Sequence, residues 1–127
     1  MKFAARLWLF AVLSAGSFAV HAGCETADMD VRITKSVWHN RCSKQNCAEL
    51  KGSAVLTSTC KEVAGVQVRL SGLDASGSPI AQRDSWPYAL SEVQEGEYSF
   101  SLDKWLKHDP EIRGFRIEVI QVRPLAR

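Results

Sequence analysis

Residues 48–59 read AELKGSAVLTST, and this stretch decides the fold because its apolar side chains recur mainly at every second position. A period of two is typical of a β-strand with one buried face, whereas a helix repeats its apolar positions about every 3.6 residues. The same alternation runs through residues 30–40, 66–70, 80–86, 98–102 and 112–123. The sequence therefore predicts an all-β protein with six short strands.

Turn-forming residues separate these strands. Residues 74–79 read DASGSP, in which Asp opens a turn, Gly supplies a positive φ and Pro blocks further pairing. Asp103 is expected to cap a short helix that ends at His108 and buries Trp105 and Leu106. The prediction is a small, immunoglobulin-like β-sandwich with one short helix, because a single sheet could not bury all of these apolar faces.

The first residues have the pattern of an export signal. Lys2 and Arg6 precede an apolar run at residues 7–13, and small side chains lead up to Ala22, after which we expect cleavage. The apolar stretch of residues 7–20 is too short to span a bilayer comfortably, so we expect no stable membrane insertion once the leader is removed.

Cleavage would leave one domain, residues 23–127, in the bacterial periplasm. A lipid anchor on Cys24 is the less favoured alternative, because His21 stands where lipoprotein signals carry leucine. The whole chain has 16 Lys and Arg against 14 Asp and Glu, and the leader removes two of the basic residues. The mature chain is then balanced and has no basic stripe or tail, which argues against nucleic acid as a partner.

The four cysteines are expected to form two disulfides. An even number of cysteines in a small exported chain is typical of disulfides, and these four allow three pairings: Cys24, Cys42, Cys47 and Cys60. A redox motif usually has two residues between its cysteines, whereas the closest pair here has four. A zinc site would need reduced thiolates, which an oxidising compartment disfavours.

Strand alternation favours one of the three pairings. If Cys42 bonds Cys47, the loop between the first two strands is closed, and the apolar positions of both strands fall on one face. The predicted register pairs Ile33 with Leu56, Lys35 with Ala54, Val37 with Gly52 and His39 with Leu50. It also places Met29 opposite Cys60, which makes Cys24–Cys60 the second bond. Closing these loops would contribute roughly 4 kcal/mol for Cys24–Cys60 and roughly 2 kcal/mol for Cys42–Cys47.

The closed loop is the first candidate binding surface, because a loop held by a disulfide loses little entropy when it binds. It presents four polar side chains: Ser43, Lys44, Gln45 and Asn46. The loop looks like the short disulfide-closed loop of periplasmic lysozyme inhibitors, although those loops carry a histidine and this one does not. The alternative is a hairpin whose disulfide is only structural.

Aromatic side chains provide the other candidates. In the predicted register, Trp38 lies on the outer face with Lys51 across from it, and exposed tryptophans frequently anchor interfaces. The alternative is that Trp38 packs beneath the helix predicted at Asp103. A third candidate is Trp86-Pro87-Tyr88, although most aromatic residues in a small domain belong to the core.

Segments between residues 50 and 100 resemble the FxLYD-type immunoglobulin-like domains of bacterial envelope proteins. The resemblance covers about half of the predicted mature chain and rests on Leu50-Lys51-Gly52, Val66-Gln67-Val68-Arg69-Leu70, Asp74-Ala75-Ser76-Gly77, Ile80, Gly96 and Tyr98-Ser99-Phe100. It implies a sandwich with a binding or accessory role, and it brings no catalytic residues.

No catalytic motif is evident in the sequence. His108 adjoins Asp109, but neighbouring side chains point apart, and His39 lies at a predicted strand end. We therefore expect a protein that is not an enzyme, needs no cofactor or metal, and binds another envelope or secreted protein. The alternative is an inhibitor or immunity protein that blocks a cell-wall hydrolase through the Cys42–Cys47 loop.

Overall fold

The computed structural model describes residues 24–40 and 47–125, so the predicted leader and Cys42 lie outside the described residues. A short 3-10 helix, η1, precedes the first strand, and a second, η2, lies between the fourth and fifth strands. The elements are η1 (Thr26–Asp28), β1 (Met29–Asn40), β2 (Ala48–Ser58), β3 (Val63–Leu73), β4 (Pro79–Ser85), η2 (Tyr88–Leu90), β5 (Gly96–Ser101) and β6 (Gly114–Pro124). No helix in this part of the chain is long and apolar enough to cross a bilayer.

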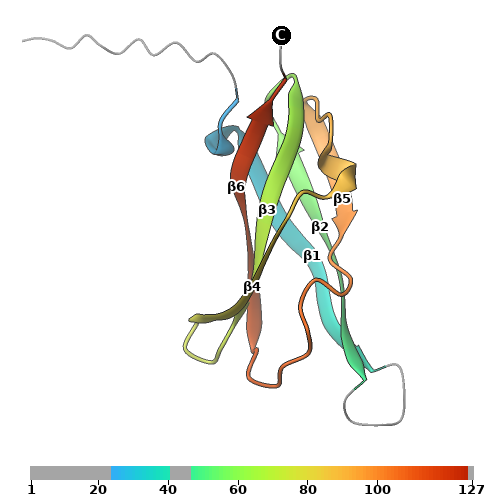
Figure 1. The fold of residues 1–127 in the computed structure, drawn as a ribbon, viewed down its shortest axis with the longest axis vertical. Coiled ribbons are helices and arrows are strands. Elements are labelled where there is room, and N and C mark those ends of the chain that lie inside the picture. The colour runs from blue at the N-terminus through green and yellow to red at the C-terminus, as the bar shows by residue number, and fades with distance from the viewer. Residues whose placement is uncertain (1–23, 41–46, 126–127) are drawn as a thin grey trace, which may run out of the picture.

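The strands form two three-stranded antiparallel sheets. One sheet has the order β1-β2-β5 and the other the order β4-β3-β6, so β2 and β3 are the middle strands. The chain makes a hairpin within each sheet and crosses between the sheets after β2, β4 and β5 (Figure 1). This arrangement confirms the prediction of a small all-β sandwich.

The core lies between the two middle strands. Their inward side chains alternate as the sequence predicts, and all of them are fully buried: Leu50, Ala54 and Leu56 of β2, and Val66, Val68 and Leu70 of β3. Leu102, which follows β5, and Leu90 of η2 are fully buried as well. Burying a leucine or valine contributes about 1.5–3 kcal/mol, so this cluster dominates the stability of the domain.

The predicted turn between β3 and β4 is confirmed. Gly77 adopts a φ of 87°, a conformation that side chains other than glycine rarely take. The Asp74 carboxylate accepts hydrogen bonds from the backbone N–H groups of Ser76 and Ser78, at 2.9 and 3.0 Å. These hydrogen bonds lower the pKa of Asp74, with the Ser76 hydroxyl contributing most.

The predicted Cys24–Cys60 disulfide is also confirmed, with 6.0 Å between the two Cα atoms. It ties the residues before η1 to the end of β2. The backbone N–H of Thr59 donates to the carbonyl of Asp28 at 3.0 Å beside it. Cys47 is disulfide-bonded too, whereas Cys42, the partner predicted for it, lies outside the described residues.

The register predicted for the first two strands is wrong. Val31 faces Leu56 and Ile33 faces Ala54, and the register then shifts between Ile33 and Lys35 so that Trp38 faces Leu50. A β-bulge at this point adds one residue to β1, which turns the rest of the strand over. Trp38 therefore shares the inner face with Leu50, and its neighbour Val37 is 47% exposed on the outer face.

The helix predicted at residues 103–108 does not form, and this segment is a turn. Strand β2 extends beyond the end of β5 and needs hydrogen-bond partners for its backbone there. Residues 102–107 supply them: Leu102 N–H donates to the carbonyl of Gly52 and Lys104 N–H to the carbonyl of Leu50, each at 2.9 Å. The predicted burial of Leu106 is confirmed, at 7% exposed.

Candidate functional site

The hairpin end of the sandwich, where β1 ends and β2 begins, brings together the segments that carry the predicted binding residues. The loop residues 43–46 fall outside the described residues. Lys51 lies on the outer face, where its ammonium is 3.6 Å from the Asp103 carboxylate. Trp38 is half-buried and does not stand free on the outer face as the predicted register required.

An aromatic cluster closes this end of the sandwich. The Trp38 ring meets the His108 ring edge to face, with 4.9 Å between the centroids. The Phe115 ring of β6 packs against the same indole at 5.6 Å. The cluster joins β1, β6 and the segment before β6 at this end of the molecule.

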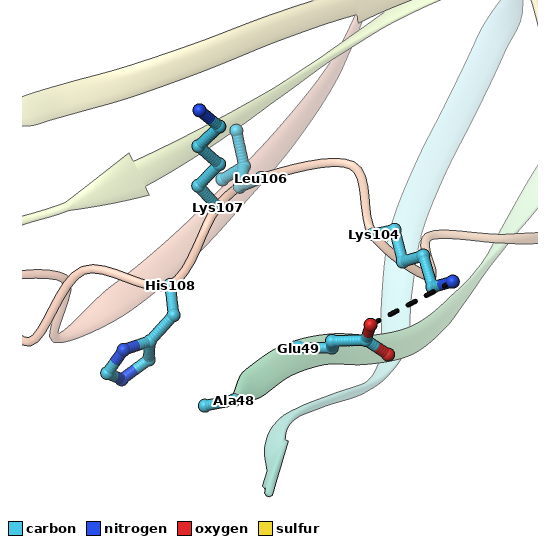
Figure 2. Close-up of a pocket in the computed structure, with 6 residues that line it drawn as sticks. All are labelled: Ala48, Glu49, Lys104, Leu106, Lys107 and His108. Atoms are coloured by element: carbon cyan, nitrogen blue, oxygen red, sulfur yellow. Dashed lines mark ion pairs between the residues drawn. The ribbon is translucent and has the colours of Figure 1, made fainter. Parts of the chain in front are cut away.

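A groove of about 470 Å³ opens beside this cluster. Its described walls are Ala48, Glu49, Lys104, Leu106, Lys107 and His108. Figure 2 shows the side chains of Lys107 and His108 leaving their segment in different directions, and the ion pair between Glu49 and Lys104. The volume lies within the range of about 300–1,000 Å³ that is common for ligand pockets.

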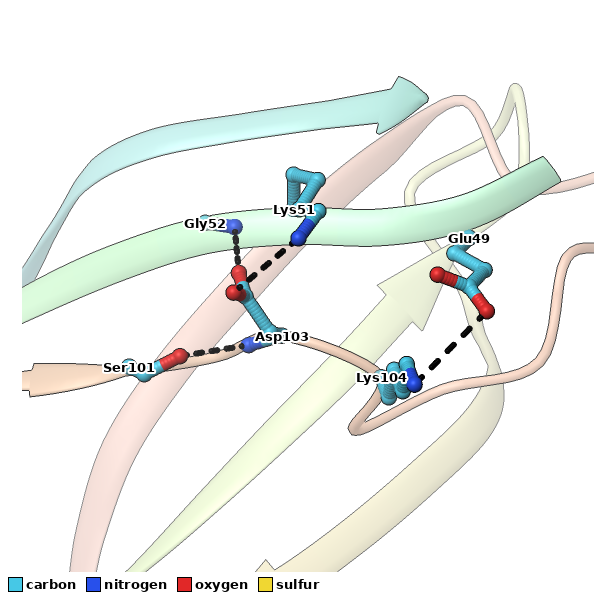
Figure 3. Close-up of polar contacts among 6 residues, drawn as sticks. All are labelled: Glu49, Lys51, Gly52, Ser101, Asp103 and Lys104. Atoms are coloured by element: carbon cyan, nitrogen blue, oxygen red, sulfur yellow. Dashed lines mark hydrogen bonds and ion pairs between the residues drawn. The ribbon is translucent and has the colours of Figure 1, made fainter. Parts of the chain in front are cut away.

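The backbone around Asp103 shapes the groove. The Asp103 carboxylate accepts a hydrogen bond from the Gly52 N–H at 2.8 Å, and the Asp103 N–H donates to the Ser101 hydroxyl at 3.0 Å (Figure 3). The next residue, Lys104, has a φ of 65°. This left-handed conformation is unusual for a long side chain, and such strained residues cluster at functional sites.

The neighbours of Asp103 favour its ionised form. The hydrogen bond from the Gly52 N–H, together with the Lys51 ammonium, lowers the pKa of Asp103 below its ordinary value. The carboxylate is therefore ionised at neutral pH. Its charge strengthens the hydrogen bond from Gly52, which holds the start of residues 103–108 against β2.

The groove has more positive than negative charge among its described walls. Lys104 lies 3.8 Å from the Glu49 carboxylate, with side chains 63% and 29% exposed respectively. Lys107 is exposed, and its ammonium forms no ion pair with any described residue. The backbones of Lys107 and Glu49 form an isolated antiparallel bridge, which joins residues 104–108 to the start of β2.

The described residues contain one group of side chains that could hold a metal ion, and it lies away from the groove. Their one group of three potential metal ligands is Cys24, Asp28 and Cys60, and the two sulfur atoms of this group are bonded to each other. The ring of His108 meets the Trp38 ring edge to face. The described walls of the groove carry charged side chains, Glu49, Lys104 and Lys107, that can pair with a charged group.

Of the predicted binding segment Trp86-Pro87-Tyr88, the tryptophan packs against another side chain and the tyrosine is exposed. Trp86 lies under the Arg123 guanidinium, which is 4.2 Å from the ring centroid. Tyr88, in η2, is 93% exposed. The Ser91 hydroxyl donates to the Tyr88 carbonyl at 2.8 Å, so the turn that carries this tyrosine is well fixed.

Sequence reasoning missed Lys104, Lys107 and Glu49, because it placed the first two on a helix and treated the third as an ordinary strand residue. The pair of lysines at 104 and 107 beside His108 was the available signal. No protein-family model matches the chain, and neither a curated protein nor a solved structure matches it significantly.

Proposed function

We propose that this chain is a non-catalytic binding module of the bacterial envelope, which recognises another envelope or secreted protein at the hairpin end of the sandwich. The observation that carries this proposal is the groove lined by Glu49, Lys104 and Lys107. The exposed ammonium of Lys107 on its rim forms no ion pair with a described residue, and an aromatic cluster lies beside it. Loops gathered at one end of a β-sandwich are a common binding surface, because the sheets hold them in place.

An exported location supports this role. Disulfides persist in oxidising compartments, and this domain has Cys24–Cys60 at one end and a disulfide-bonded Cys47 at the other. The leader pattern at residues 1–22 agrees with export to the periplasm. Small exported domains depend on such bonds because their cores are modest.

Inhibition of a cell-wall hydrolase is the second candidate. Its support is that Cys47 is disulfide-bonded and directly precedes Ala48, which lines the groove. In this mechanism the loop would enter the active-site cleft of the hydrolase while the groove side contacts its rim. Substituting Lys44 and Gln45 with alanine should then abolish inhibition, and unchanged inhibition would rule the mechanism out.

Crosslinking followed by co-purification from envelope extract tests the proposed function. The wild-type chain should recover a defined partner, and Lys107→Glu should lose it because the substitution reverses the charge on the groove rim. Lys61→Glu is the matched control, because Lys61 is an exposed lysine at the other end of β2. Equal recovery by all three proteins, or no partner at all, would contradict the proposal.

A further inference from the structure

We infer that the groove recognises a carboxylate of an extended, acidic segment of the partner protein, with Lys107 as its first contact and Lys104 as its second. This inference rests on the proposed function and gives it a ligand chemistry. It also assigns a role to Glu49: its carboxylate pairs with the Lys104 ammonium in the free protein, and the partner's carboxylate replaces it on binding.

Lys107 is placed to make the first contact. Its backbone is fixed by the bridge to Glu49, while its side chain is exposed at the groove and forms no ion pair with a described residue. A fixed backbone whose ammonium has no ion pair with the described residues has little to reorganise when an anion binds. Leu106, which is 7% exposed, lies against the core at the base of the groove and can contact the aliphatic part of an acidic side chain.

The pair of Lys104 and Glu49 behaves as an exchangeable contact. Its 3.8 Å separation is too long for a hydrogen bond, and the Lys104 side chain is 63% exposed. Exposed ion pairs at such distances contribute only about 0–1 kcal/mol, so a carboxylate from the partner can replace that of Glu49 at small cost.

The backbone of Lys104 gives independent support. Among the described residues other than glycine, only Glu92 and Lys104 have a positive φ, and the conformation of Lys104 is held by the Asp103 contacts. A glycine or asparagine would take this conformation with less strain.

The geometry favours a peptide over a membrane surface. Binding to anionic lipid requires several cations that project from one flat or convex face. Here the described cations line a concave space of about 470 Å³ with an acid among them, which suits one side chain of a partner.

Fluorescence anisotropy with two labelled peptides tests the inference. The first peptide alternates glutamate with serine over ten residues, and the second replaces each glutamate with glutamine. The wild-type chain should bind the glutamate peptide, and the glutamine peptide should bind several-fold more weakly. Lys107→Ala should weaken binding of the glutamate peptide about two- to fivefold, which is the size expected for one exposed ion pair. Glu49→Gln should tighten it, because the competing carboxylate is gone.

Lys61→Ala is the control and should leave the affinity unchanged, because its position is a full strand length from the groove. Equal binding of the two peptides, no binding of either, or a Glu49→Gln variant that binds no tighter would overturn the carboxylate inference. Binding to phosphatidylglycerol vesicles that depends on Lys107 would overturn it too, in favour of a lipid surface. If the peptides fail while Lys107→Glu still abolishes recovery of a partner from envelope extract, the proposed function stands and only the ligand chemistry is wrong.

Discussion

The backbone N–H of Gly52 donates a hydrogen bond of 2.8 Å to the carboxylate of Asp103 (Figure 3). This contact joins the middle strand of one sheet to the segment that carries Lys104 and Lys107. It ends the regular pairing of β2 with β5 and starts the irregular path of residues 103–108.

The charge of Asp103 should make part of the stability dependent on pH. Because the Gly52 hydrogen bond lowers the pKa of Asp103 in the folded protein, its contribution is fully present above the ordinary aspartate pKa. That contribution is lost as the pH falls through the lowered value. Asp103→Asn should therefore melt at a lower temperature than the wild type at pH 7, and the two proteins should converge near pH 2.

Thermal melting followed by circular dichroism between pH 7 and pH 2 checks this prediction. Glu97→Gln, which alters an exposed carboxylate on β5, is the control and should have a smaller effect at pH 7. Asp74 and Asp84 also have lowered pKa values, so all variants will lose stability in acid. A difference between Asp103→Asn and the wild type that stays constant down to pH 2 would show that the charge has no such role.

Gly52 should not tolerate a larger side chain. An added Cβ would lie 2.5 Å from the carbonyl oxygen of Lys35, which is a backbone atom beside the bulge in β1 and cannot easily move. Gly52→Ala should lower the free energy of unfolding by about 1–3 kcal/mol, as overpacking does elsewhere. Gly114→Ala is the matched control, because nothing lies within 4 Å of its Cβ position.

Urea denaturation of the two glycine variants gives the comparison. The control should stay within about 1 kcal/mol of the wild type, since a glycine in a compatible conformation is replaced at little cost. A Gly52→Ala protein as stable as the wild type would show that the Lys35 carbonyl leaves room for a Cβ at position 52.

Replacing Lys104 should separate stability from binding. Lys104→Gly removes the strain of a positive φ and should raise the free energy of unfolding by roughly 0.5–1 kcal/mol, while partner binding weakens because a groove cation is lost. Glu92→Gly makes the same change at a φ of 59° away from the groove, and should gain stability without losing binding. Calorimetry on both variants tests the first part. A Lys104→Gly protein that binds its partner as well as the wild type does would contradict the second.

The Cys24–Cys60 disulfide should hold the other end of the sandwich. Replacing both cysteines with alanine should cost about 2–4 kcal/mol, because the bond closes a long loop in the unfolded chain. Guanidinium denaturation of the double variant measures this loss. A loss below about 1 kcal/mol would mean that neighbouring contacts, such as that of Thr59 with Asp28, already fix this end.

The strands could be predicted from the sequence because alternation is a local signal. Leu50, Ala54 and Leu56 are buried as their spacing indicates. The Cys24–Cys60 bond also followed from the strand pattern, even though the predicted register was wrong. A bulge such as the one between Ile33 and Lys35 leaves no local mark, because it arises from the contact of two strands.

The groove could not be predicted for a related reason. Residues 103–108 begin with Asp, the usual start of a short helix, but in the structure this carboxylate binds the N–H of Gly52 on another strand. The unpaired backbone of β2 outweighs the weak helical preference of six residues. Long-range contacts with β2 place the two lysines at the groove: the Lys104 N–H donates to the carbonyl of Leu50, and the backbone of Lys107 forms a bridge with Glu49.

The most direct test of the binding surface is photo-crosslinking in living cells, with a photoreactive amino acid placed at position 107 or at position 61. We predict a crosslink to one defined protein from position 107 and none from position 61. Lys104→Glu should reduce the crosslink from position 107. Crosslinks from position 61 alone, or equal crosslinks from both positions, would show that the hairpin end is not the surface through which this protein acts.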